Sequence, residues 1–178
     1  PEGIAVISKA KSNGVDVTAE TCPHYLVFDE SDMIERGAVA KCAPPLRPAG
    51  TKNGLWTEVR SRRVDTIGSD HSPAPPDLKF PPDDDFRKAW GGIASCQHAF
   101  PAFLSAHGRP FETVAELIAA NPATRLGFGD RKGQIAVGFD ADLTILGAPD
   151  QEAVRAEDLL YRHAISPYVG RDIPWGVG

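Results

Sequence analysis

Apolar positions recur at helical spacing at the start of the chain. Ile4, Ile7 and Ala10 are three residues apart, and the run stops at Asn13 and Gly14. Both of these residues tolerate the left-handed backbone geometry at a helix end. The pattern therefore predicts a helix over residues 2–13.

Three short strands are predicted in the next part of the chain. Residues 15–21 alternate apolar and polar side chains with a period of two, and the strand should end before Pro23, which has no backbone N–H. Small apolar residues in 38–42, followed by a proline pair, predict a second strand. Residues 64–70 predict a third, mostly apolar strand of the kind that is covered on both faces.

Helical patterns lie between and after these strands. They are centred on residues 55–59, on 93–104 with a possible kink at Pro101, and on 114–118. Strands that alternate with helices predict an α/β fold with a parallel sheet.

The chain changes character beyond residue 129. There, Gly turns flank a predicted strand at 143–145, which indicates part of a small β module. Residues 73–85 are rich in proline and aspartate and predict a long loop.

Composition narrows the class of protein. The chain has 178 residues, of which 42% are hydrophobic and 24% charged, enough for one soluble globular domain with a core. A net charge of -5 and the lack of a long apolar run argue against nucleic-acid and membrane partners. Three cysteines without zinc-knuckle or redox spacing predict reduced thiols and a cytoplasmic protein. The chain begins at Pro1 and stops in "IPWGVG", so we expect an excerpt of a longer protein.

Each predicted strand is followed by reactive or rigid residues. His24 follows the first strand, Lys41 and Cys42 the second, and Asp70 and His71 the third. The carboxyl ends of the strands form the active face of a parallel α/β barrel. Histidine and aspartate are suitable Zn²⁺ ligands, and bound Zn²⁺ lowers the pKa of water to about 7. A catalytic zinc site generally takes three protein ligands, so these two alone fall short.

Several phrases together carry a family resemblance. The runs "ETCPHYL", "AKCAPPLRP", "SDHSPAPPDLK", "KAWGGIA" and "YRHAISPYVGR" occur in this order over most of residues 1–172. In that order they resemble the C-terminal half of the bacterial-type allantoinases, in the cyclic amidohydrolase branch of the metal-dependent amidohydrolase superfamily. "SDHSP" alone is shared with dihydroorotases and hydantoinases, so the allantoinase resemblance depends on "KCAPPLR" and "KAWGGIA".

The resemblance implies a fold and a metal site. The fold would be the C-terminal part of a (β/α)₈ TIM-type barrel over residues 1–129, with part of a small β module over 130–178. The barrel rim would carry two divalent metal ions, taken as Zn²⁺. By motif position His24 is similar to the sixth-strand histidine ligand and Asp70 to the eighth-strand aspartate, while the other four ligands would lie N-terminal to this chain.

The resemblance also implies an activity. Metal-assisted hydrolysis would open the cyclic amide of allantoin, a small-molecule ureide of purine catabolism, to give allantoate. Asp70 would bind metal and act as the catalytic general base, and backbone groups of Ala43 and Gly92 would bind the substrate. Many relatives carry serine at the position of Ala43 and cysteine at that of Ala74. Family likeness suggests a homo-oligomer, a tetramer, and two ligands alone predict a fragment that is inactive by itself.

Other interpretations stay open. The complete protein could be a hydantoinase or dihydropyrimidinase-type enzyme, or a metal-free amidohydrolase-like scaffold. His24 alone could be a core-edge histidine, and Asp70 could cap a turn. His71 could support the metal site by hydrogen-bonding Asp70, could contact the substrate, or could simply pack. The remaining candidates are expected to be structural: small buried thiols at Cys22 and Cys42, packing or surface positions at His98, His107 and His163, and a solvated acidic turn at residues 83–85.

Overall fold

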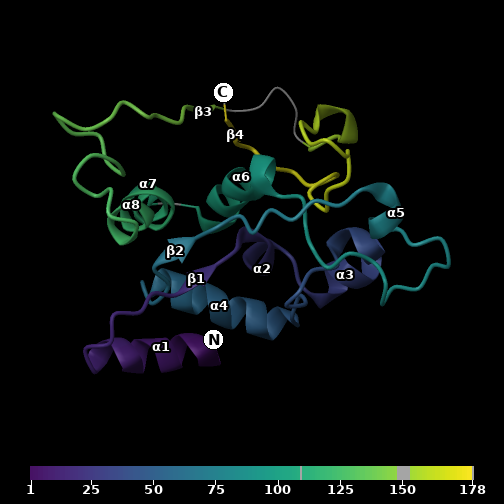
Figure 1. Cartoon of the computed structure of the whole chain (residues 1–178), viewed down its shortest axis with the longest axis horizontal. Coiled ribbons are helices and arrows are strands. Elements are labelled where there is room, and N and C mark those ends of the chain that lie inside the picture. Colours follow the sequence, from purple (N-terminus) through teal and green to yellow (C-terminus); the bar gives the residue numbers. More distant parts are fainter. Residues whose placement is uncertain (109, 148–152, 178) are drawn as a thin grey trace.

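Two short parallel strands lie between layers of helices (Figure 1). The computed structural model describes residues 1–178 except 109, 148–152 and 178. The strands are β1 (Glu20–Thr21) and β2 (Thr66–Ile67). In Figure 1, α1 (Glu2–Ser12) and α4 (Ala49–Arg60) lie below them, and α6 (Cys96–His107) lies above.

The parallel pairing joins two distant parts of the chain directly. Glu20 is in register with Thr66, and Thr21 with Ile67. The Asp65 carboxylate strengthens this junction because it accepts a hydrogen bond from the Ala19 backbone N–H at 2.6 Å. The predicted α/β class is therefore confirmed, with a parallel sheet reduced to short strands.

Shorter elements complete the described chain. The helix α3 (Glu30–Arg36) begins with a capping box: the side chain of Asp29 accepts a hydrogen bond from the backbone N–H of Asp32, and the side chain of Asp32 accepts one from the backbone N–H of Asp29. The short elements are α2 (Pro23–Val27), α3 (Glu30–Arg36), the 3₁₀ turn η1 (Gly37–Ala40), α5 (Pro76–Lys79), α7 (Phe111–Ala115), the π turn η2 (Glu116–Ala120), α8 (Asn121–Arg125) and the 3₁₀ turn η3 (Ala156–Asp158).

The main core joins the helices on both sides of the strands. Trp56 of α4 stacks on Phe103 of α6, with ring centroids 6.0 Å apart. Burial of these aromatic side chains supplies much of the hydrophobic stabilisation that fixes the helices on the strands. The other buried members of this cluster are Ile4, Ala19, Leu26, Val59, Val64, Leu104, Val114 and Leu117.

Three predicted elements differ in the structure. Residues 37–40 form the 3₁₀ turn η1 where a strand was predicted, because the Lys41 N–H bonds the Ala38 carbonyl in place of a neighbouring strand. The predicted strand at 143–145 is also wrong: Leu143 and Ile145 are exposed, and the strand β3 (Leu146–Gly147) begins one residue later. The predicted loop contains the short helix α5.

The C-terminal part of the chain contains a second strand pair. The strand β3 pairs antiparallel with β4 (Gly176–Val177). This pairing fits a small β element, while the boundary at residue 129 stays a prediction, and part of the predicted second domain lies outside the described residues. Within the described ranges, no helix combines the length and apolar character needed to cross a bilayer.

Candidate metal centre at the strand ends

The local sequence of α2 places His24 inside the protein. Cys22 has an extended backbone and directly precedes the helix, and Pro23 occupies its first turn, where a missing N–H costs no hydrogen bond. His24 follows and is only 1% exposed. The helix is anchored by the Trp56 indole, whose Nε1 donates to the Leu26 carbonyl at 2.8 Å.

The His24 ring is buried without hydrogen-bond partners. Neither Nδ1 nor Nε2 has a partner among the described residues. Buried polar atoms are nearly always satisfied, so an unpartnered imidazole at a strand end indicates a place for a ligand. Burial lowers the pKa of His24 to about 4, and the nearby Asp70 charge only partly opposes this shift. The ring is therefore neutral near pH 7, the form that donates a nitrogen lone pair to a metal.

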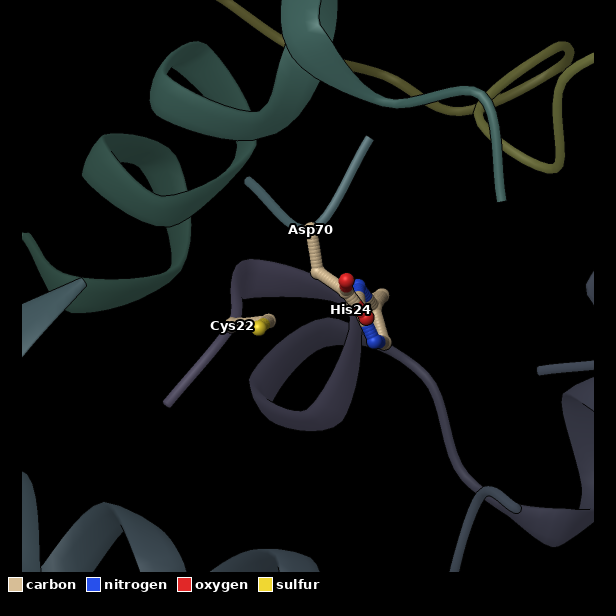
Figure 2. Close-up of side chains that lie close together, drawn as sticks. All are labelled: Cys22, His24 and Asp70. Atoms are coloured by element: carbon tan, nitrogen blue, oxygen red, sulfur yellow. The ribbon is translucent and has the colours of Figure 1, made fainter. Parts of the chain in front are cut away.

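Asp70 lies just beyond β2, on the segment that leaves the sheet. Its backbone φ is +45°, a left-handed value that is uncommon for residues with a side chain. Such strained backbone persists where the surroundings enforce it, and it occurs often at functional sites. The left-handed conformation turns the chain just after the strand, and the Asp70 side chain is directed toward α2 (Figure 2).

Cys22, His24 and Asp70 form one cluster of possible metal ligands. One donor atom from each lies within 4.8 Å of the other two. Figure 2 shows the Asp70 carboxylate directed at the His24 ring, with the Cys22 side chain turned toward both. An imidazole and a carboxylate suit Zn²⁺ and other divalent cations. Burial raises the pKa of Cys22 to about 12, and the Asp70 charge adds to this shift, so the thiol is protonated in the metal-free protein.

The two predicted substrate-contact segments lie against each other. A Cβ built on Gly91 would lie 3.5 Å from the Ala43 Cβ, so residues 90–93, here named the glycine loop, pack on the segment that follows η1. Gly92 has no room for a side chain, because a Cβ there would lie 2.4 Å from Ser72 Oγ. The structure thus brings the Ala43 and Gly92 regions together.

His71 has partners other than the predicted ones. Its Nδ1 accepts hydrogen bonds from the backbone N–H groups of Ser95 at 2.9 Å and Cys96 at 3.1 Å. The ring therefore caps the start of α6, and it packs beside Tyr161 with centroids 5.3 Å apart. No hydrogen bond joins His71 to Asp70 in the described part of the chain. Contact with the substrate stays a prediction.

The other histidines lie outside the cluster. His98 stacks on Tyr168, with ring centroids 6.1 Å apart, and burial lowers its pKa. His107 packs against Trp56 and Phe103. Both belong to α6 and have packing contacts, in line with their expected structural roles.

A cavity of about 270 Å³ lies beside α2, away from the cluster. Tyr25 is on its wall, and the Tyr25 hydroxyl donates to the Pro44 carbonyl at 2.8 Å. His24 and Asp70 are not among its lining residues, so this cavity does not define the metal centre. The remaining lining residues are Pro1, Glu2, Pro45, Arg47, Thr51, Lys52 and Leu55.

Sequence reasoning missed one role and one residue of this region. Cys22 was predicted to flank the site as a small buried side chain rather than a ligand; its 9% exposure confirms the burial, and its sulfur lies within the cluster of possible ligands. The Cys-Pro-His spacing across a strand-to-helix turn is the signal that could have indicated it. Lys79 is 3% exposed, and nothing in "PPDLK" distinguishes it from a surface lysine.

Sequence comparisons agree with the predicted resemblance. A profile described as "Amidohydrolase family" matches residues 65–169. The allantoinase of Rubrobacter xylanophilus is 51% identical over 173 residues, covering 95% of this chain and 37% of that protein. The allantoinase of Bacillus licheniformis is 43% identical, covering 97% of this chain and 38% of that protein. The chain thus spans less than two fifths of these curated relatives.

Solved structures give the same answer for the fold. The L-hydantoinase (dihydropyrimidinase) of Arthrobacter aurescens matches with a TM-score of 0.92 and 33% identity, covering 99% of this chain and 40% of that chain. The dihydropyrimidinase of Brevibacillus agri matches with a TM-score of 0.88 and 27% identity, covering 98% of this chain and 40% of that chain. These matches confirm the predicted fold class, a part of an α/β amidohydrolase barrel. The 178-residue chain belongs to the amidohydrolase family.

Proposed function

We propose that these residues belong to a metal-dependent cyclic amidohydrolase that hydrolyses allantoin to allantoate. The observation that carries the proposal is the buried His24 ring, with two unpartnered nitrogens, beside the Asp70 carboxylate. Allantoinases at 51% and 43% identity support allantoin as the substrate. Both residues belong to motifs that carry the resemblance to these relatives.

The two side chains would have different tasks. When bound, a pair of divalent cations, most simply Zn²⁺, would polarise the ring carbonyl and lower the pKa of the attacking water. His24 would hold one cation through a ring nitrogen. An Asp70 carboxylate oxygen would also bind metal and would accept a proton from the attacking water as its oxygen bonds the carbonyl carbon. The ring C–N bond then breaks, and Asp70 passes the proton to the departing nitrogen.

The substrate would lie against backbone rather than charged side chains. Ala43 and Gly92 belong to segments that pack together, and Gly92 is a position where the neighbouring Ser72 and Trp90 leave no room for a side chain. Backbone N–H and C=O groups can bond the amide edge of a small ureide ring. These two segments are the proposed substrate contacts.

The test is a substrate comparison with the full-length protein that carries these residues. The protein is purified with its metal content measured, and allantoin, unsubstituted hydantoin and a dihydropyrimidine are compared by kcat/KM. We expect the highest value for allantoin. No turnover of any cyclic amide by a metal-loaded protein would contradict the proposal, and a full-length protein that binds no metal would favour a metal-free scaffold.

A hydantoinase or dihydropyrimidinase activity is the second candidate. The likeness to the Arthrobacter aurescens L-hydantoinase, with a TM-score of 0.92, favours it. A kcat/KM value higher for hydantoin or a dihydropyrimidine than for allantoin would establish it. The same assay therefore separates the two enzyme candidates.

The isolated 178 residues should hydrolyse little allantoin. The described residues offer one cluster of three possible ligands, and one of these is a protonated thiol. A two-metal site needs further ligands from elsewhere. The three free cysteines fit the expected cytoplasmic location, and a homo-oligomer, expected to be a tetramer, stays part of the proposal.

A further inference from the structure

Lys79 is a buried cation that the proposed chemistry does not use. Its side chain is enclosed at the end of α5, and among the described residues no carboxylate pairs with it. The Nζ group donates to three backbone carbonyls, those of Lys41 at 3.0 Å, Trp90 at 3.0 Å and Gly92 at 2.7 Å. An ammonium has three hydrogens, so these contacts use all of its donors.

The three carbonyls belong to two segments far apart in the sequence. Lys41 lies two residues before Ala43, whereas Trp90 and Gly92 belong to the glycine loop. The backbone of Gly91 approaches Ala43 beside this junction, so closely that a side chain on Gly91 would touch the Ala43 Cβ. One side chain thus joins the two segments that are proposed to meet the substrate.

The glycine loop is also bonded to the chain that leaves Asp70. The Ser72 N–H donates to the Ile93 carbonyl at 2.9 Å, and His71 forms a parallel bridge with Ile93. The Trp90 indole Nε1 donates to the Ser72 carbonyl at 3.2 Å. Contacts at Trp90 and Ile93, the two ends of the glycine loop, therefore fix the position of this loop relative to the Asp70 carboxylate.

We propose that Lys79 is a positioning residue, which holds the backbone around Ala43 and Gly92 at a fixed separation so that both can bind the cyclic amide substrate. This role rests on the proposed function. Lys79 would not touch the substrate or the metal, and its effect would pass through the carbonyls that it bonds. A neutral side chain cannot replace it fully, because glutamine has two N–H hydrogens at this position and methionine has none.

The test compares Lys79→Met and Lys79→Gln in the metal-loaded full-length protein. Lys88→Met is the matched control, since Lys88 follows α5 in the same part of the chain but is exposed and pairs with Asp83. Lys79→Met removes all three hydrogen bonds but acts on the substrate only through the position of the backbone, so we expect KM to rise about tenfold and to rise by more than kcat falls. Lys79→Gln should give an intermediate KM, and Lys88→Met should match wild type.

Further measurements separate positioning from general damage. Bound metal per chain should be the same in all variants, because Lys79 does not bond His24 or Asp70. A Lys79→Met protein with wild-type KM, or one that loses metal and kcat together with an unchanged KM, would overturn the proposal. If the Met variant does not fold, Lys79→Gln takes its place. A KM above that of wild type supports the proposal, and a wild-type KM overturns it.

Failure of the proposed function gives a different result. In that case the wild-type protein opens no cyclic amide, and hydrogen exchange replaces kinetics. The backbone amides of residues 90–94 should then exchange faster in Lys79→Gln than in Lys88→Met. Equal exchange rates would overturn the positioning role whether or not the enzyme assay succeeds.

Discussion

The Trp56 indole and the Leu26 carbonyl are joined by a buried hydrogen bond of 2.8 Å. Leu26 belongs to the short helix that carries His24, and Trp56 belongs to the longer α4. A five-residue helix has little stability of its own, so this contact with a packed helix fixes the backbone that presents the imidazole. The core and the candidate metal centre are thus physically linked.

Replacing Trp56 by phenylalanine should remove the hydrogen bond to the Leu26 carbonyl while keeping an uncharged aromatic side chain in the core. Trp56→Phe leaves the buried Leu26 carbonyl without its donor, and we expect the free energy of unfolding to fall by about 1–3 kcal/mol. Urea denaturation of the full-length protein measures the change. Leu160→Ala is the control, because Leu160 is 87% exposed and its truncation should cost little. Equal stability of the two variants would contradict the prediction.

Loss of the His24 imidazole should remove metal. For His24→Asn we expect a lower metal content per chain by atomic emission, and activity reduced by at least about 100-fold, since even indirect partners of metal ligands contribute 10- to 100-fold. The same change at His163 is the control, because that residue lies outside the cluster. Wild-type metal content in the His24 variant would show that the ring is only a core residue.

The Asp70 carboxylate should matter more for turnover than for substrate binding. Asp70→Asn keeps the size of the side chain but removes the proton acceptor, and kcat should fall by about 10²- to 10⁴-fold, the usual contribution of general acid–base catalysis. Steady-state kinetics at matched metal content provides the measurement. If the Asn variant keeps the wild-type kcat, the general-base role is wrong.

The backbone at Asp70 gives a separate prediction for stability. Its φ of +45° suits glycine, whereas alanine at this φ retains the steric cost of a Cβ. We therefore expect Asp70→Ala to be less stable than Asp70→Gly by about 1 kcal/mol, with both variants equally inactive. Thermal and urea unfolding of the two proteins compare them directly. A more stable alanine variant would mean that the left-handed geometry is not retained.

Local apolar spacing predicted the longer helices because their burial follows a regular period. Helices α1 and α4 are present where Ile4, Ile7 and Trp56 indicated them. The short apolar run around Val39 suits a strand and a helical turn equally well. Its conformation depends on hydrogen-bond partners elsewhere, and here the chain bonds locally as a 3₁₀ turn.

The candidate site was predictable to a similar extent. His24 and Asp70 belong to distinctive motifs, and the structure places them within one cluster. The cap formed by His71 depends on the start of α6, whose distance from β2 no local pattern specifies. Lys79 resembles a surface lysine until three carbonyls from separate segments surround it.

Burial of the Lys79 ammonium should leave a signature in the pH dependence of stability. Burial is the main cause that lowers its pKa from 10.5 to about 8; the Lys41 charge also lowers it, and Cys42 opposes the shift. Between about pH 8 and pH 10.5, the Lys79 amine is protonated in the unfolded chain but has lost its proton in the folded chain. The free energy of unfolding contributed by Lys79 must therefore rise with pH across this window and stay level below it.

The comparison with Lys79→Met isolates this group, because other titrating residues are shared by both proteins. We expect the stability of wild type relative to the Met variant to increase between pH 8 and 10, as measured by urea denaturation at each pH. Over the same range a neutral amine can donate to at most two of the three carbonyls, so wild-type KM should rise toward that of the variant. A stability difference that stays constant with pH would show that folding does not lower the pKa of Lys79.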